Sequence, residues 1–194
     1  MKRSATMLIA VALLLTGGFA YGQQETGPHF EHLKAFGPML GTWRYEGPLL
    51  EDIPGYADKG SRCVTQIIWR WILNKNAVEV IWSTDFAGGK KISGKGLFGW
   101  NAADQKVVFG GMNSIGSMEL GTLEFDEDEK AATLTVKGID AEGNETSSKE
   151  VARKTDRDTL TLQVVERTGG DMEGSGPVYT YKRVKRAGAK KAAK

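Results

Sequence analysis

The chain has 194 residues, of which 40% are hydrophobic and 26% are charged, a balance that suits one globular domain with a sizeable core. Lys and Arg together number 26 and Asp and Glu number 24, so the formal net charge is only +2. Cys63 is the single cysteine. An internal disulfide is therefore excluded, and the fold must rely on packing.

Residues 1–22 have the pattern of a secretory signal peptide. Two basic residues precede an apolar run over residues 7–15, and Ala20-Tyr21-Gly22 forms a small-x-small cleavage site. The apolar run is too short to serve as a permanent membrane span. We therefore expect an exported protein, either periplasmic or secreted.

Charge is divided unevenly along the rest of the chain. The leader contains two basic residues and no acidic one, so 24 basic and 24 acidic residues remain after it. Five of these basic residues fall in residues 185–194, which leaves the preceding domain at a formal charge of about −5. An acidic domain disfavours nucleic-acid binding. We expect residues 185–194 to be a basic, disordered tail, with weak contact to envelope polymers or anionic lipid as the alternative role.

Residues 23–38 form a lead-in to the first strand. Phe30, Leu33 and Phe36 recur at helical spacing, which predicts a short helix that covers one end of the domain. Residues 39–47 follow with the alternation of an opening strand, which places Gly41 and Trp43 on one face. We expect Gly41 to leave room beside the large indole.

Two hairpins have registers that their side chains specify. Residues 63–73 and 77–85 pair around a two-residue turn at Asn74 and Lys75, so that Ile67 faces Trp82 and Arg70 faces Glu79. An unpaired charge is costly in an apolar core. We therefore expect the aromatic side chains to point inward, with Arg70 and Glu79 on the outer face. The inverse arrangement, with a polar interior, is the alternative.

The second hairpin joins residues 91–101 to residues 105–113. Pairing Trp100 with Val107 places Phe98 opposite Phe109, and it also brings glycines of the two strands together. Glycines inside strands indicate either strong coiling, as barrel closure demands, or space for a ligand.

Alternation indicates four further strands, over residues 118–125, 132–138, 146–154 and 159–167, and a closing strand over residues 178–184. About ten strands with no long helical period predict an all-β fold. The expected architecture is a single antiparallel up-and-down barrel over residues 39–184. A β-sandwich of similar strand number is the competing architecture.

Three short motifs carry a resemblance to known barrels: Leu40-Gly41-Thr42-Trp43; Gly96-Leu97-Phe98-Gly99-Trp100-Asn101 with Lys106-Val107-Val108; and Val178-Tyr179-Thr180-Tyr181-Lys182-Arg183. In these motifs the chain resembles a bacterial family of lipocalin-like, calycin-type barrel domains of unknown function, distantly similar to nitrobindin-like barrels. The resemblance implies that Trp43 plugs one barrel end, that Arg183 lies across its face, and that the barrel holds an internal ligand. Nitrobindin-like members hold haem through a histidine near the C-terminus. This chain has Tyr179-Thr180-Tyr181 there, so we expect no cofactor.

No catalytic constellation is visible in the sequence, which favours a binding protein over an enzyme. Ser114 and Ser117 lack the setting of an activated nucleophile. His29 and His32 are the only histidines, too few for a zinc site, and we expect no metal. We expect Cys63 to be a small, buried hydrophobic residue. An enzyme that uses carboxylates or tyrosines is the less favoured alternative.

The aromatic interior is the candidate site for a small hydrophobic or amphipathic ligand. The residues predicted to line it are Trp69, Trp71, Trp82, Phe98, Trp100, Phe109, Asn113, Tyr179 and Tyr181, with Gly41, Trp43 and Arg183 closing the barrel. The alternative is that the rings simply fill a narrow barrel. Such a filled barrel would act as an envelope interaction protein that makes contact through its tail.

Overall fold

The computed structural model describes residues 26–126, 128, 130–169 and 172–185. The expected signal peptide and all but the first residue of the expected tail lie outside this part of the chain. Two helical segments, α1 (Phe30–Leu33) and η1 (Lys34–Met39), precede the strands, and a third, η2 (Leu73–Lys75), joins two of them. The strands are β1 (Gly41–Pro48), β2 (Arg62–Ile72), β3 (Ala77–Phe86), β4 (Lys91–Asn101), β5 (Lys106–Asn113), β6 (Met118–Asp126), β7 (Ala131–Ile139), β8 (Glu145–Asp156), β9 (Thr159–Thr168) and β10 (Tyr179–Arg183).

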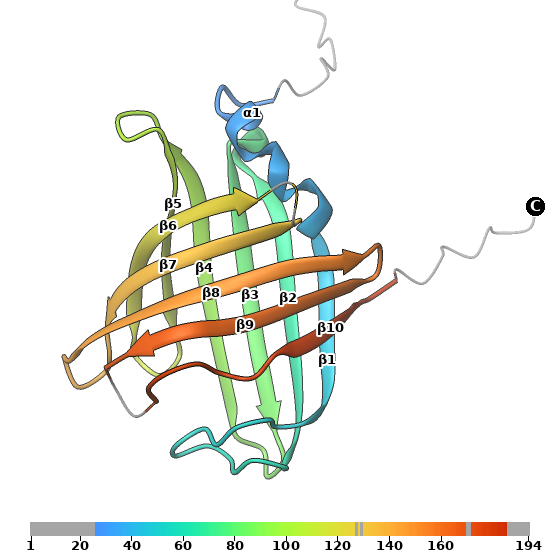
Figure 1. Cartoon of the computed structure of the whole chain (residues 1–194), viewed down its shortest axis with the longest axis vertical. Coiled ribbons are helices and arrows are strands. Elements are labelled where there is room, and N and C mark those ends of the chain that lie inside the picture. Colours follow the sequence, from blue (N-terminus) through green and yellow to red (C-terminus); the bar gives the residue numbers. More distant parts are fainter. Residues whose placement is uncertain (1–25, 127, 129, 170–171, 186–194) are drawn as a thin grey trace, which may run out of the picture.

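These strands form one closed antiparallel barrel. Each strand pairs with its neighbours in sequence, and β1 pairs with β10 to complete the circle (Figure 1). The predicted all-β up-and-down architecture is confirmed, and the competing sandwich is excluded because no second sheet is present in the described residues. Closure removes the unpaired strand edges that an open sheet would expose. In the described part of the chain, no helix has the length and apolarity needed to cross a membrane.

The registers of both long hairpins are as predicted. Ile67 lies opposite Trp82 between β2 and β3, and Phe98 lies opposite Phe109 between β4 and β5. The predicted turn is wrong, since residues 73–76 make a four-residue connection that includes η2. The register is unchanged because the observed connection exceeds the predicted turn by one residue on each side.

The outer face of this hairpin holds a three-membered charge cluster. Arg70 lies opposite Glu79, as predicted, and its Nη2 is 2.5 Å from the carboxylate. Lys95 of β4 pairs with the other carboxylate oxygen. The Glu79 side chain is only 5% exposed, so two cations compensate a carboxylate that the sheet surface largely covers.

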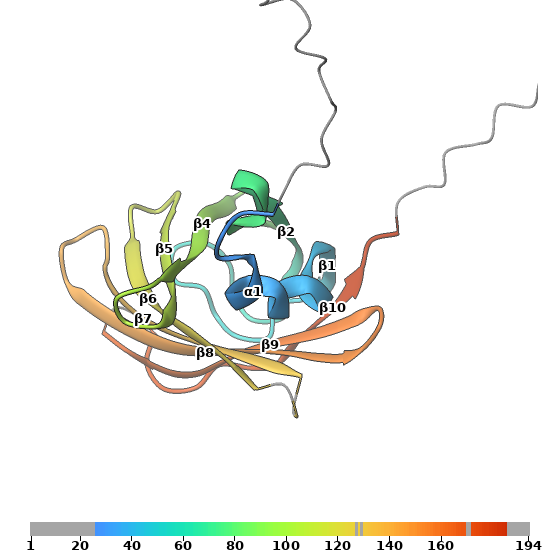
Figure 2. The same cartoon turned by 90° about the horizontal axis from the view of Figure 1, so that it is seen from above.

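The N-terminal segment plugs one end of the barrel. Seen from above, α1 and η1 lie across the opening of the ring of strands (Figure 2). Leu33 and Phe36 have no exposed surface. Phe36 packs against Trp69, Phe98 and Phe125, with ring centroids 5.7, 5.0 and 4.9 Å away. The plug therefore continues the aromatic core.

The seam between β1 and β10 is built around one stacked pair. Trp43 is fully buried, and the Arg183 guanidinium carbon lies 4.1 Å from the centroid of its ring. Arg183 also donates from Nη1 to the Leu40 carbonyl at 2.6 Å and from Nη2 to the Pro38 carbonyl at 2.9 Å. Gly41 makes room for this guanidinium rather than for the indole, since a Cβ there would lie 2.6 Å from Nη1. One side chain thus ties the last strand to the entry of the first.

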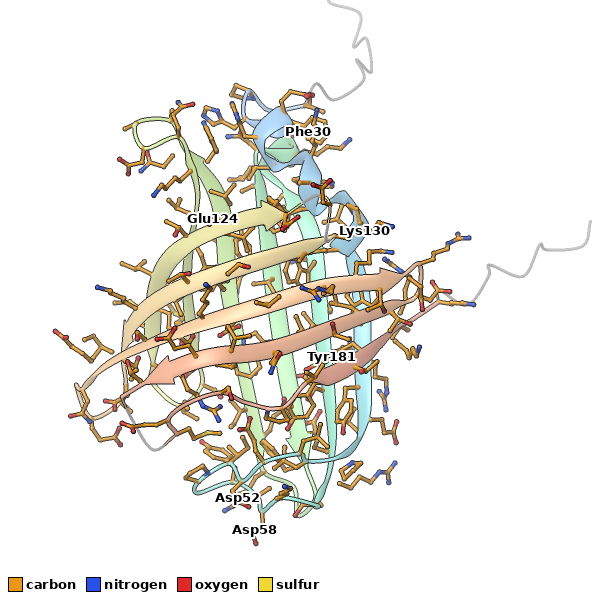
Figure 3. All side chains as sticks on the ribbon, in the orientation of Figure 1. Phe30, Asp52, Asp58, Glu124, Lys130 and Tyr181 are labelled. Carbon is orange, nitrogen blue, oxygen red and sulfur yellow. The ribbon has the colours of Figure 1, made fainter. Side chains whose placement is uncertain are left out.

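A loop formed by residues 49–61 crosses the other end of the barrel. Asp52 and Asp58 of this loop lie at the opposite end from Phe30 of the plug (Figure 3). A second, smaller core lies beside the loop and consists of Leu49, Cys63, Phe86 and Ile92. Burial raises the pKa of the Cys63 thiol, which suits an unreactive packing residue.

Candidate functional site

The barrel encloses a cavity of about 430 Å³. Side chains from every strand from β2 to β10 line it, together with residues of the loop over the open end. Small-molecule sites in proteins occupy about 300–1,000 Å³. The interior is therefore large enough for a small ligand, and it is the candidate site.

Stacked aromatic rings form the wall of the cavity near the plug. Trp69 and Phe98 are stacked with centroids 5.7 Å apart, and Phe98 packs on Phe109 at 4.8 Å. All three line the cavity and are less than 10% exposed. They offer a rigid apolar surface to a guest.

The strand glycines near this wall make room for the chain's own rings. A Cβ on Gly94 would lie 2.5 Å from the ring of Trp82, and one on Gly96 would lie 2.3 Å from the ring of Phe109. Both rings lie across the backbone of the neighbouring strand. The glycines therefore shape the wall, and larger residues there would displace the aromatic side chains.

Hydroxyl groups lie on the side of the cavity formed by β2, β3 and β10. The Tyr179 hydroxyl accepts a hydrogen bond from the backbone N–H of Leu50 at 3.1 Å, and the hydroxyls of Thr65 and Thr84 are 2.9 Å apart. Tyr181 is 6% exposed, and burial raises the pKa of its phenol. These groups are neutral donors and acceptors at physiological pH.

Two carboxyl groups also enter the cavity, Glu119 from β6 and Glu150 from β8. Burial raises the pKa of Glu119. Burial, and then the charge of Glu119, raise the pKa of Glu150 to about 7. The Ser148 hydroxyl donates to Glu150 Oε1 at 3.2 Å, which opposes the rise in pKa. Glu150 is therefore poised to change charge near neutral pH.

The carboxylate of Glu51 also lines the cavity but is compensated. Arg167 Nη2 lies 2.5 Å from Glu51 Oε2, and the two side chains are 16% and 22% exposed. This ion pair joins the loop over the open end to β9. Its charges cancel locally, unlike those of Glu119 and Glu150.

The cavity brings together seven of the nine residues predicted to line it: Trp69, Trp82, Phe98, Phe109, Asn113, Tyr179 and Tyr181. Trp71 and Trp100 are not among its lining residues. Trp71 packs on Phe30 of the plug at 5.5 Å, and Trp100 stacks on His32 with centroids 3.9 Å apart. These two tryptophans hold the plug instead.

The side chain of Asn113 has a structural role at the rim of the cavity. Its side-chain oxygen accepts hydrogen bonds from the backbone N–H groups of Ile115 and Ser117, each at 3.1 Å. It thereby orders the turn between β5 and β6.

Across residues 26–126, 128, 130–169 and 172–185, no group of three or more His, Cys, Asp and Glu side chains is placed to hold a metal ion.

The sequence analysis did not identify Glu119 or Glu150 as site residues. The sequence contained a signal for Glu119, because alternation places it on the same face of β6 as Leu123 and Phe125. That signal was ambiguous, since Met118 and Leu120 make the opposite face of the strand equally apolar. For Glu150, alternation in β8 does not indicate an inner face, because Val151 and Ala152 lie on opposite faces and the other residues of the strand are polar.

Comparisons with known proteins bear on the fold. No family model matches the chain, and no curated protein matches it. Among solved structures, the crystal structure of Rv2717c from M. tuberculosis is similar, with a TM-score of 0.57. The match covers 83% of this chain and 100% of that one, at 18% sequence identity. This protein is therefore a ten-stranded closed barrel that shares its overall fold with a mycobacterial protein.

Proposed function

We propose that this protein binds a small amphipathic molecule inside the barrel. The observation that carries the proposal is the cavity of about 430 Å³, whose lining combines an aromatic wall with a few hydroxyl and carboxyl groups. An apolar wall with a few placed polar groups is the usual composition of a ligand site. A cavity of this size favours this function over the alternative of a barrel filled by its own side chains.

The proposal includes a place among the calycin-like barrels. The stacking of Arg183 on Trp43 and the closure of β1 on β10 support it. Such barrels enclose ligands between their two ends, and here the plug and the loop of residues 49–61 occupy those ends.

Tryptophan fluorescence tests ligand binding directly, because Trp69 and Trp82 line the cavity. We expect amphipathic alcohols and amines to change the emission with saturable affinity. Replacing Ala152, a lining residue of β8, with Phe should weaken that binding by occupying the cavity. Lys149→Phe, on the exposed face of the same strand, is the matched control. Saturable binding that A152F leaves unchanged would contradict a ligand in the barrel.

A second candidate function, chemistry on the bound molecule, is favoured by Glu150. A carboxyl group whose pKa is about 7 suits a general acid or base at neutral pH. Amphipathic esters, amides and glycosides can be incubated with the protein and the products followed by mass spectrometry. Turnover that is lost in Glu150→Gln would support an enzyme, and no turnover of any of them would leave binding as the function.

We also propose that the protein is exported. The proposal rests on the basic start, the apolar run and the small-x-small site of residues 1–22. Expression of the full chain in a bacterium, followed by mass spectrometry, should find a processed protein that begins at Gln23. An intact N-terminus on protein from the cytoplasm would contradict export.

A further inference from the structure

The charges that face the cavity are acidic. Glu119 and Glu150 enter it from β6 and β8, and Glu51 enters from the loop. Glu51 is paired with Arg167. In the described part of the chain, no Lys or Arg nitrogen lies within ion-pair distance of Glu119 or Glu150. Lys95 is among the lining residues, but its ammonium group pairs with Glu79 on the outer face.

The other titratable groups that face the cavity do not compensate these carboxylates. They are the phenols of Tyr179 and Tyr181 and the thiol of Cys63. Burial raises the pKa of each of these groups, which keeps all three neutral at physiological pH. A ligand that enters the cavity therefore meets a negative field without a positive counterpart.

We propose that the cavity selects amphiphiles that carry a protonated amine and rejects those that carry a carboxylate. The inference rests on the proposed function and names its ligand class. The amine would donate to Glu150 and Glu119, and the alkyl or aromatic body would pack on Phe98 and Phe109. A carboxylate head group would be repelled by the two glutamates and would lack a cation to pair with.

Four probes of equal chain length test the preference: decylamine, aminodecanol, decanol and decanoate. Isothermal titration calorimetry at pH 8, where Glu150 is largely ionised, should rank the two amines at least about tenfold tighter than decanol. Decanoate should bind more weakly than decanol.

Variants assign the preference to the two carboxyl groups. Glu150→Gln, alone and with Glu119→Gln, should remove most of the preference for amines, measured in each variant as the ratio of decylamine affinity to decanol affinity. Glu124→Gln is the matched control, because Glu124 lies exposed on the outer face of β6 (Figure 3). It should bind all four probes as the unaltered protein does.

The outcomes separate this inference from the proposed function. If decanol binds but decylamine binds no better, or if decanoate binds most tightly, the amine preference is overturned while ligand binding stands. If E150Q and E124Q change the ranking equally, the carboxyl pair is not the cause. If none of the four probes binds, the proposed function and the ligand class both fail. The ranking in the unaltered protein decides the preference even if a variant does not fold.

Discussion

Replacing Glu150 with Gln should change how the stability of the protein depends on pH. The ordinary pKa of a glutamate is 4.5, and burial beside Glu119 raises that of Glu150 to about 7 in the folded protein. Between these two values the folded state holds a proton that the unfolded state has released. The free energy of unfolding therefore falls as pH rises through this window and levels off above it. At about 1.4 kcal/mol per pH unit, the total loss is about 3 kcal/mol.

Urea denaturation of both proteins, followed by tryptophan fluorescence from pH 4 to pH 8.5, measures this effect. We expect E150Q to be nearly as stable as the unaltered protein at pH 4, where Glu150 is neutral in both states. At pH 8 the variant should be more stable by up to about 3 kcal/mol, because it has no charge to bury. Glu124→Gln, on the outer face, should leave the pH dependence unchanged. Parallel curves for E150Q and the unaltered protein would refute the reasoning, since they would show that Glu150 ionises as freely as in water.

Three further predictions follow from contacts within the barrel. Arg183→Met removes the cation from the face of Trp43 and three hydrogen bonds to backbone carbonyls, so we expect urea denaturation to show a loss of about 2–4 kcal/mol. A loss below about 0.5 kcal/mol would show that Arg183 does not hold the seam together. Gly96→Ala places a Cβ 2.3 Å from an aromatic ring, whereas a Cβ at Gly99 meets nothing within 4 Å. G96A should lower the free energy of unfolding by about 1–3 kcal/mol, and G99A should leave it almost unchanged. Equal melting temperatures for the two variants would count against the placement of the ring. The Cys63 thiol, 1% exposed, should react with Ellman's reagent only slowly until urea unfolds the protein, and rapid reaction of the native protein would show that the cavity wall opens.

Local patterns predicted much of the barrel correctly. Strand alternation and cross-strand pairs such as Ile67 with Trp82 predicted the registers, because a slip by one residue would reverse the faces of both strands. The turn between β2 and β3 was wrong, yet the register held. Side-chain pairing over ten positions evidently outweighs the conformation of a short connection.

The residues of the candidate site could be predicted only in part. Trp69 and Trp71 share one strand face, but the first lines the cavity and the second packs on the plug. Alternation predicts which face a side chain belongs to, whereas the tilt and stagger of the strands decide where it lies along the barrel axis. That stagger accumulates around the closed sheet and has no local signature in the sequence.

The sequence by itself therefore determined the all-β class, the strand pairing and the aromatic interior, because all three depend on a period of two residues and on neighbouring strands. Only the tertiary structure decided that Gly41 admits Arg183 rather than Trp43, and that Glu119 and Glu150 share one cavity. Gly41 and Arg183 meet because closure of the barrel pairs the first strand with the last. Glu119 and Glu150 come from β6 and β8, which flank β7, and only the three-dimensional course of these strands turns both side chains into the same cavity.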